Sequence, residues 1–205
     1  MPNLAYQTIP DQEHPSHGLW IETVSGRVID LVQPSPSQIE ISDIAWALSR
    51  ANRFAGNTCG RTPYSVACHS VWVADYVFDQ TRSAEIALHA LLHDAAEAYM
   101  GDIPRPLKKL VPEVHEVEQR LLSAIYEALY LEQPDSVVQG IIERADEQAL
   151  MREAETFMVS RGVGWPQVQL TRLARCSPKP MAVNSEKAAT LFYRNFRRLN
   201  EEVNQ

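Results

Sequence analysis

Apolar residues recur at helical spacing over most of the chain beyond residue 36, which predicts a largely helical protein. The expected helices are Ser37 or Ser42 to Arg53, Thr62–Pro63 to Phe78, Ser83 to Met100, Pro112 to Leu131, Ser136 to Ser160, and one from Ser185 onward. Upstream, the run WIETVSGRVIDLV contains two short apolar segments around Ser25–Gly26, a pattern typical of a β-hairpin. We therefore expect an all-α fold with a small N-terminal β-hairpin appendage.

The order of these segments predicts three parts of the chain. Residues 1–36 form a polar lead-in and the hairpin, residues 37–160 form a helical core, and residues 161–205 form an irregular loop followed by a helix that packs on the core. A length of 205 residues fits one domain with appendages.

Composition and charge exclude several classes of protein. A hydrophobic fraction of 45% excludes wholesale disorder, and the absence of a long apolar run predicts that the chain does not cross a membrane. Three cysteines without C-x-x-C spacing, and an N-terminus unlike a signal peptide, favour a reduced, cytoplasmic protein. The net charge of −7 disfavours a nucleic-acid partner. The chain length leaves the oligomeric state open, a homo-oligomer included.

Polar side chains interrupt the apolar stripes of three expected helices. His69 lies on the inward stripe of the second helix, and Asp146 lies on that of the fifth. The third helix is apolar nearly all round, yet it contains His93, Asp94 and Glu97. A buried carboxylate costs several kcal/mol unless it is paired, hydrogen-bonded or bound to a metal. Three helices therefore direct polar groups toward one interior.

These groups allow an ordinary structural explanation and a metal-site explanation. A histidine on an apolar stripe is commonly a hydrogen-bonded core residue, and Asp146 could pair with Arg144 or Arg152. Two imidazoles and two carboxylates together suit Mn, Fe, Co, Ni or Zn better than Mg or Ca. Four protein ligands would leave coordination positions open for water and substrate, as in a catalytic site. We therefore expect one divalent metal ion.

Longer segments around these residues resemble a known family. The order of His69, His93–Asp94 and Asp146 resembles the H…HD…D signature of the HD-domain metal-dependent phosphohydrolases. The run HDAAEAYMGDIPRPLK resembles the HDxxExxxGDxPxPxK segment of the bacterial 5'-deoxynucleotidase branch. ADEQAL resembles the segment that carries the last aspartate of that branch, and Asn52–Phe54 followed by SVACHS resembles its arginine-aromatic pair and first metal histidine. The match covers roughly residues 43–155, and implies an HD-domain helical bundle over residues 37–160.

The resemblance also implies a reaction and a set of roles. The reaction is removal of phosphate from nucleotides, above all deoxyribonucleoside 5'-monophosphates. The implied roles are metal ligands His69, His93, Asp94 and Asp146; substrate-binding residues Arg53, Phe54 and Lys108; and catalytic residues Glu97 and Asp102. The branch usually has Trp where this chain has Phe54, so a sugar preference does not carry over from that position.

Two alternative functions remain open from the sequence. The first is hydrolysis of a dNTP with release of triphosphate, which the same ligand set would serve. Five arginines outside the match could contact the additional phosphates of such a substrate, or could instead form a solvated helix face. They are Arg172, Arg175, Arg194, Arg197 and Arg198. The second is a nucleotide-sensing module without turnover. Arg61 and Arg105 are further candidate phosphate contacts, and His89 is expected to be a core residue or a partner of a metal ligand.

Overall fold

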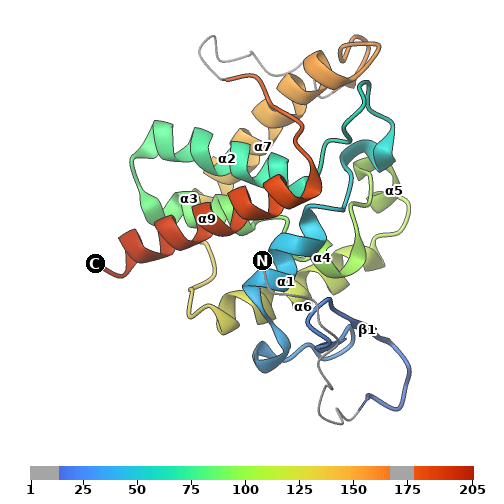
Figure 1. The fold of residues 1–205 in the computed structure, drawn as a ribbon, viewed down its shortest axis with the longest axis vertical. Coiled ribbons are helices and arrows are strands. Elements are labelled where there is room, and N and C mark those ends of the chain that lie inside the picture. The colour runs from blue at the N-terminus through green and yellow to red at the C-terminus, as the bar shows by residue number, and fades with distance from the viewer. Residues whose placement is uncertain (1–13, 167–177) are drawn as a thin grey trace.

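The computed structural model describes residues 14–166 and 178–205, and most of these residues are helical (Figure 1). The strands are β1 (Trp20–Glu22) and β2 (Val28–Asp30). The helices are α1 (Ile41–Leu48), α2 (Val66–Thr81), α3 (Ala84–Leu92), α4 (Glu97–Met100), α5 (Arg105–Lys108), α6 (Glu113–Ala128), α7 (Ser136–Phe157) and α9 (Ser185–Val203), with 3₁₀ turns at Pro36–Gln38 and Arg53–Gly56. The expected all-α class with a small hairpin is confirmed. The N-terminal lead-in as far as residue 13, and Arg172 and Arg175, lie outside the described residues.

The hairpin is fastened to the first helix by hydrogen bonds. Strands β1 and β2 pair antiparallel, and Gly26 closes the turn in a left-handed conformation with φ of 83°. The hydroxyls of Thr23 and Ser25 each donate to Oδ2 of Asp43 on α1 at 2.6 Å. Because Asp43 is buried, these two bonds satisfy a carboxylate that would otherwise be costly to remove from water.

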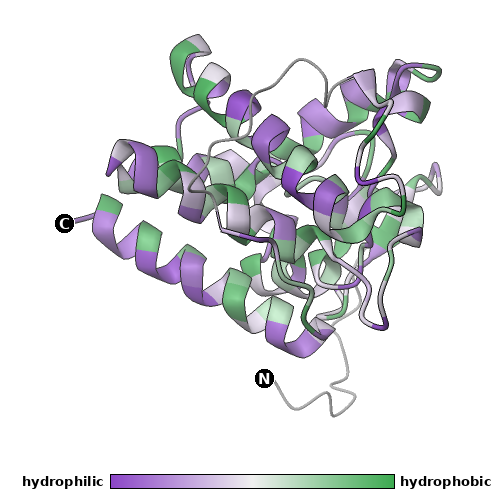
Figure 2. Ribbon diagram, turned by 90° about the horizontal axis from the view of Figure 1, so that it is seen from above, coloured by the Kyte–Doolittle hydropathy of each residue, from purple (hydrophilic) through white to green (hydrophobic). Residues whose placement is uncertain are grey.

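The core lies where α1, α2, α3, α7 and α9 meet. Helices α2 and α3 pack against each other, α7 packs against both, and α9 lies across α1, α2 and α3 (Figure 1). Along α9 hydrophobic and hydrophilic residues alternate in blocks (Figure 2), and Phe192, Phe196 and Leu199 are buried. Burial of each such side chain contributes about 1.5–3 kcal/mol. The C-terminal helix therefore completes the core that holds α2 and α3 in place.

Helix α1 is shorter than expected, because the chain turns sharply after it. The expectation that it continues to Arg53 is wrong, since it ends at Leu48. Phe54 and Ala55 adopt left-handed conformations with φ of 58° and 50°. This conformation costs roughly 1–2 kcal/mol for a residue with a Cβ, so it marks a locally strained turn immediately after Arg53.

Helix α2 begins later than expected. The prediction of a start at Thr62–Pro63 is wrong, because the helix begins at Val66, after an extended Ser65. The backbone N–H of Arg53 donates to the Tyr64 carbonyl at 2.9 Å. Ser65 is the N-cap, and its hydroxyl accepts from the Cys68 N–H. The pairing brings Arg53 beside the first turn of α2.

The continuous helix expected over residues 83–100 is interrupted in the middle. Helix α3 ends at Leu92, and α4 begins only after residues 93–96. Within the interruption the backbone tightens, since the Ala95 N–H donates to the Leu92 carbonyl, three residues back, at 2.9 Å. Tightened stretches inside helices often mark functional positions. Here the interruption falls on the His93–Asp94 dipeptide.

Candidate metal centre

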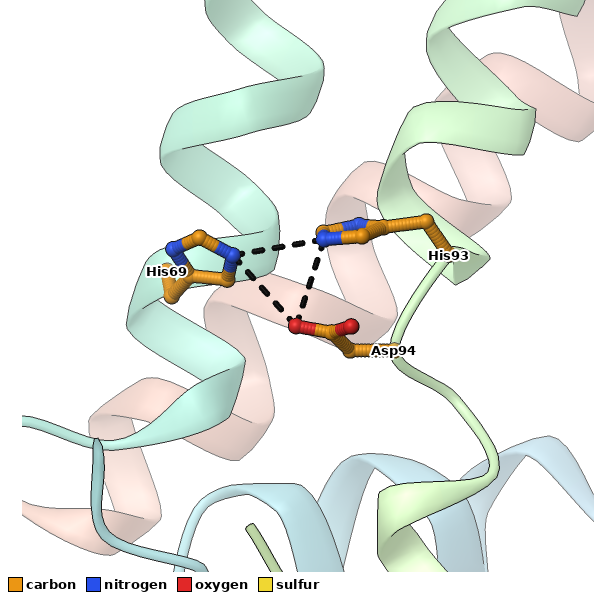
Figure 3. A group of neighbouring side chains, drawn as sticks. All are labelled: His69, His93 and Asp94. Carbon is orange, nitrogen blue, oxygen red and sulfur yellow. Dashed lines mark hydrogen bonds and ion pairs between the residues drawn. The ribbon is translucent and has the colours of Figure 1, made fainter. Parts of the chain in front are cut away.

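Three ligand-type atoms converge where α2 faces the interruption between α3 and α4 (Figure 3). The Nε2 atoms of His69 and His93 are 3.3 Å apart. Oδ2 of Asp94 lies 3.4 Å from Nε2 of His69 and 3.2 Å from Nε2 of His93. The two consecutive residues His93 and Asp94 would point about 100° apart on a regular helix. The tightened backbone instead lets both side chains meet His69.

Helix α7 contributes the fourth predicted ligand. Oδ1 of Asp146 is 3.2 Å from Nε2 of His69, and its Oδ2 accepts from Nη2 of Arg105 at 2.8 Å. Burial acts to raise the pKa of Asp146, but its hydrogen bond with His69 and the surrounding positive charges hold that pKa below its usual range. The structure thus brings together all four predicted ligand residues from three separate segments.

The positions of the hydrogens on the two imidazole rings decide whether this group of side chains can bind a metal ion. Nδ1 of His69 is 2.6 Å from Oε1 of Glu153, and Nδ1 of His93 is 2.7 Å from the Ala90 carbonyl oxygen. Both partners are acceptors, so each neutral ring carries its hydrogen on Nδ1 and a lone pair on Nε2. When both rings are neutral, the two Nε2 lone pairs therefore face each other and Asp94 with no hydrogen between them. This arrangement repels itself unless a positive charge sits among the atoms, and it fits a divalent cation.

The pKa values of the two histidines also indicate that this position favours a positive charge. Burial and the Arg53 charge act to lower the pKa of His69, yet the carboxylate of Glu153 and further acceptors outweigh them and raise that pKa well above its usual value. Burial likewise acts to lower the pKa of His93, and the neighbouring Asp94 carboxylate raises it. The surroundings of both rings favour a positive charge at this point.

Arg53 lies against the carboxylates of this group. Its Nη1 is 3.7 Å from Asp94, and its Nη2 is 3.9 Å from Asp146 and 3.1 Å from Glu153. The Nε atom of Arg53 is buried and has no hydrogen-bond partner within residues 14–166 and 178–205. A buried donor without an acceptor is costly, so Arg53 has a free hydrogen-bonding position beside the predicted metal ligands.

Glu97 and Lys108 form the next layer of the site. Lys108 Nζ donates to Oε1 of Glu97 at 3.1 Å and to Oε1 of Glu118 at 2.7 Å. Glu97 is 3% exposed, and its Oε2 has no hydrogen-bond partner among the described residues. Burial, and then the charge of Asp94, raise the pKa of Glu97 to about 9. In the loop after α4, burial also raises the pKa of Asp102, and the charges of Arg53, Asp94 and Lys108 influence that pKa as well.

The ring of Phe54 lies near the arginine, and a second aromatic ring lies near that of Phe54. The Phe54 ring is 5.6 Å from the Arg53 guanidinium carbon, and the Trp165 ring is 6.0 Å from Phe54 between ring centroids. Trp165 comes from beyond α7, outside the segment that resembles the family. The structure therefore adds it to the surroundings of Phe54.

Other candidate residues lie in different surroundings. His89 is buried, with its ring 5.4 Å from that of Tyr126, and burial lowers its pKa, which fits a neutral core residue. Arg61 lines a cavity of about 430 Å³ whose lining includes none of the four ligand residues. On α9, Arg197 and Arg198 pair with Glu201 and Glu202. These two arginines belong to a charged face of that helix.

The sequence reasoning missed Glu153, although a signal was present. Glu153 follows Asp146 by seven residues, which is two turns along the same face of α7. It is fully buried, and its carboxylate contacts both His69 and Arg53. Extending the inward stripe of that helix by two turns would have found it.

Comparisons with known proteins agree with the fold. An HD domain matches residues 63–157, which include the four predicted ligand residues and Glu153. The chain is 35% identical over 150 residues to the uncharacterized protein YfdR of Escherichia coli, across 73% of this chain and 79% of that protein. It is 39% identical over 111 residues to an uncharacterized protein of Rhodobacter capsulatus, across 52% of this chain and 56% of that protein.

Fold, site and comparisons together describe a helical protein in which His69, His93 and Asp94 form a group that could bind a metal ion. The chain belongs to the HD-domain family. The HD domain indicates a metal-dependent hydrolase in general, and the His69, His93 and Asp94 group is suited to the ion. Among the described residues, no helix is both long and apolar enough to span a membrane.

Proposed function

We propose that the chain is a divalent-metal-dependent phosphohydrolase that removes phosphate from nucleotides, with deoxyribonucleoside 5'-monophosphates as its main substrates. The observation that carries the proposal is the convergence of the ligand-type atoms of His69, His93 and Asp94 directly beside the guanidinium of Arg53. A metal centre next to a buried, forked cation is suited to a phosphate group, which needs both charge neutralisation and directed hydrogen bonds.

The ion would be held by His69, His93, Asp94 and Asp146. A mixed nitrogen and oxygen set favours Mn, Fe, Co, Ni or Zn over Mg. When bound, such an ion supplies Lewis-acid polarisation of the phosphoryl oxygens and activation of a water molecule.

Arg53 would bind the phosphate of the substrate. Its side chain is 13% exposed, so a phosphate that reaches it is largely removed from water, where a charge-assisted hydrogen bond is strong. The unpartnered Nε offers one such bond beside the metal ligands. Glu153 and Asp94 hold the guanidinium in this position before substrate arrives.

Glu97 would supply the proton that the leaving oxygen requires. Because burial and the charge of Asp94 raise its pKa to about 9, the carboxyl group carries a proton at neutral pH. Its Oε1 is held by Lys108, which leaves Oε2 free to donate. Asp102 would assist in positioning water, since its carboxylate lies in the same field of charges.

Support for a nucleotide comes from the resemblance and from the aromatic rings. The segment from His93 to Lys108 resembles that of the 5'-deoxynucleotidases. Phe54 directly follows Arg53, with Trp165 near it, and aromatic faces of this kind can stack on a nucleobase.

The test is a product assay on metal-stripped protein, with Mn, Co, Mg or no added metal, against a panel of dNMPs, NMPs and dNTPs. The proposal predicts inorganic phosphate from monophosphates, only when metal is present, and none from an Asp94→Asn variant under the same conditions. Triphosphate from dNTPs would instead establish the alternative reaction. Nucleotide binding without turnover under every metal would contradict the proposal and favour a sensing module.

A further inference from the structure

One carboxylate connects the two halves of the site. Oε1 of Glu153 is 2.6 Å from Nδ1 of His69, and Oε2 of the same residue is 3.1 Å from Nη2 of Arg53. The histidine belongs to the metal centre, and the arginine belongs to the proposed phosphate site. Glu153 is the last polar group on the inward face of α7, and its side chain is fully buried.

Because Glu153 is buried, its carboxylate depends on both of these contacts. A buried carboxylate is stable only when both oxygens have good partners, and removing one partner of a buried pair is far more costly than removing one at the surface. Burial acts to raise the pKa of Glu153, but the charge of Arg53 and the contact with His69 hold that pKa below its usual value. The group is therefore ionised and accepts one hydrogen bond at each oxygen.

We propose that Glu153 is a positioning residue that fixes His69 and Arg53 relative to each other, so that one side chain sets both the metal affinity and the phosphate affinity of the site. The role toward Arg53 rests on the proposed function, whereas the role toward His69 requires only the metal centre. The bond to Nδ1 fixes the ring orientation and keeps the lone pair of Nε2 directed at the ion. The bond to Nη2 holds the fork of Arg53 against Asp94 and Asp146.

Glutamine at position 153 cannot accept both hydrogen bonds. A carboxylate presents an acceptor on both sides, whereas an amide presents an acceptor on one side and a donor on the other. In Glu153→Gln the amide NH₂ therefore faces a donor, either the Nδ1–H of His69 or the guanidinium of Arg53. The size of the side chain is nearly unchanged, so any loss of binding reflects the lost acceptor and negative charge rather than a cavity.

The experiment uses the full chain and three variants. Glu153→Gln removes one acceptor, and Glu153→Asp keeps both oxygens and the charge but shortens the side chain by one methylene. Glu143→Gln, on the exposed face of the same helix, is the matched control. Circular dichroism and a thermal melt first establish that each variant is folded. Calorimetric titration with Mn²⁺ or Co²⁺ gives the metal affinity, and titration of the metal-loaded protein with inorganic phosphate gives the anion affinity.

We expect both Glu153 variants to bind metal about tenfold or more weakly, the effect typical of partners that support metal-bound histidines. We expect their phosphate affinity to fall as well, and the control to match the wild type in both titrations. If Glu153→Gln does not fold, the aspartate variant carries the same test. Metal and phosphate affinities within twofold of the wild type in a folded variant would overturn the proposal.

A spectroscopic reading distinguishes failure of this inference from failure of the proposed function. The Nδ1 proton of His69, held at a short distance by a carboxylate, should give a downfield proton resonance in the wild type that is lost or shifted upfield in Glu153→Gln. This signal and the metal titration require no turnover. If both change but no nucleotide is hydrolysed by the wild type, the inference toward His69 stands and the proposed function fails. An unchanged resonance would overturn the inference, whatever the activity.

Discussion

The Nε2 atoms of His69 and His93 lie 3.3 Å apart, and neither neutral ring carries its hydrogen on that side. Each Nδ1–H is engaged by an acceptor at the back of its ring, so the lone pairs face the centre of the site. Such an arrangement is stable only with positive charge between the rings. A positive charge at this point would explain why the buried interior contains so many polar groups.

Replacing Arg53 with lysine should separate charge from geometry. Lysine keeps the positive charge but lacks the fork that offers several hydrogen bonds to phosphate. We expect Arg53→Lys to raise the KM for a nucleotide monophosphate by about 10- to 100-fold, because a hydrogen bond to a charged group is worth roughly 1.5–3 kcal/mol. Steady-state kinetics at saturating metal concentration measure this KM. Arg50→Lys, three residues earlier and exposed, is the control, and an unchanged KM at Arg53→Lys would remove that residue from phosphate binding.

Replacing Glu97 with glutamine should remove turnover without removing the metal. The amide cannot transfer a proton, and a positioned acid or base contributes a factor of about 10² to 10⁴. We expect kcat to fall by at least about 10² in Glu97→Gln, with Mn²⁺ affinity close to that of the wild type. A variant that turns over at the wild-type rate would show that Glu97 takes no part in the reaction.

The same substitution should change the dependence of stability on pH. The folded-state pKa of Glu97 is raised from 4.5 to about 9, so the stabilisation it gives is fully present below about pH 4.5 and is lost as the pH rises toward 9. Glutamine does not ionise, so Glu97→Gln should gain stability relative to the wild type as the pH increases. Urea unfolding of both proteins at pH 5, 7 and 9, with a chelator present, measures this difference. A difference that does not vary with pH would contradict the raised pKa.

The partner of Lys108 on α6 should influence the rate indirectly. Glu118 accepts from Lys108 at 2.7 Å and shares it with Glu97. Without the negative charge of Glu118, the ammonium charge acts more strongly on Glu97 and favours its ionised form. We expect Glu118→Gln to lower kcat about tenfold, a part of the factor that a positioned acid contributes, with metal affinity unchanged. Glu116→Gln, exposed on the same helix, should have no effect, and equal rates in both variants would contradict the role of Glu118.

Local sequence signals predicted much of the architecture correctly. The hairpin follows from the Ser25–Gly26 turn, and α3, α7 and α9 begin beside capping residues Ser83, Asp135 and Asn184, whose side chains accept backbone N–H groups. The site segments were predicted because polar residues at His69 and Asp146 broke apolar stripes. A buried polar group is costly, so its presence in such a stripe is informative.

The features that were missed depend on contacts between distant parts of the chain. The interruption after Leu92 contradicts a strongly helical local pattern, and only the meeting of His93 and Asp94 with α2 accounts for it. The start of α2 depends on pairing between Arg53 and Tyr64. Glu153 lies 84 residues from His69 in the sequence. Periodicity within one helix does not report which neighbour such a residue meets.

The central claim is that His69, His93, Asp94 and Asp146 hold a single divalent ion. The most direct test measures the metal content of purified protein by mass spectrometry, after loading with Mn²⁺ or Co²⁺ and removal of excess ion, for the wild type and for Asp94→Asn. The account predicts one ion per wild-type chain and almost none in the folded variant, since the variant loses a ligand charge at the point where both imidazoles meet. Equal metal content in the two proteins, or none in the wild type, would contradict it.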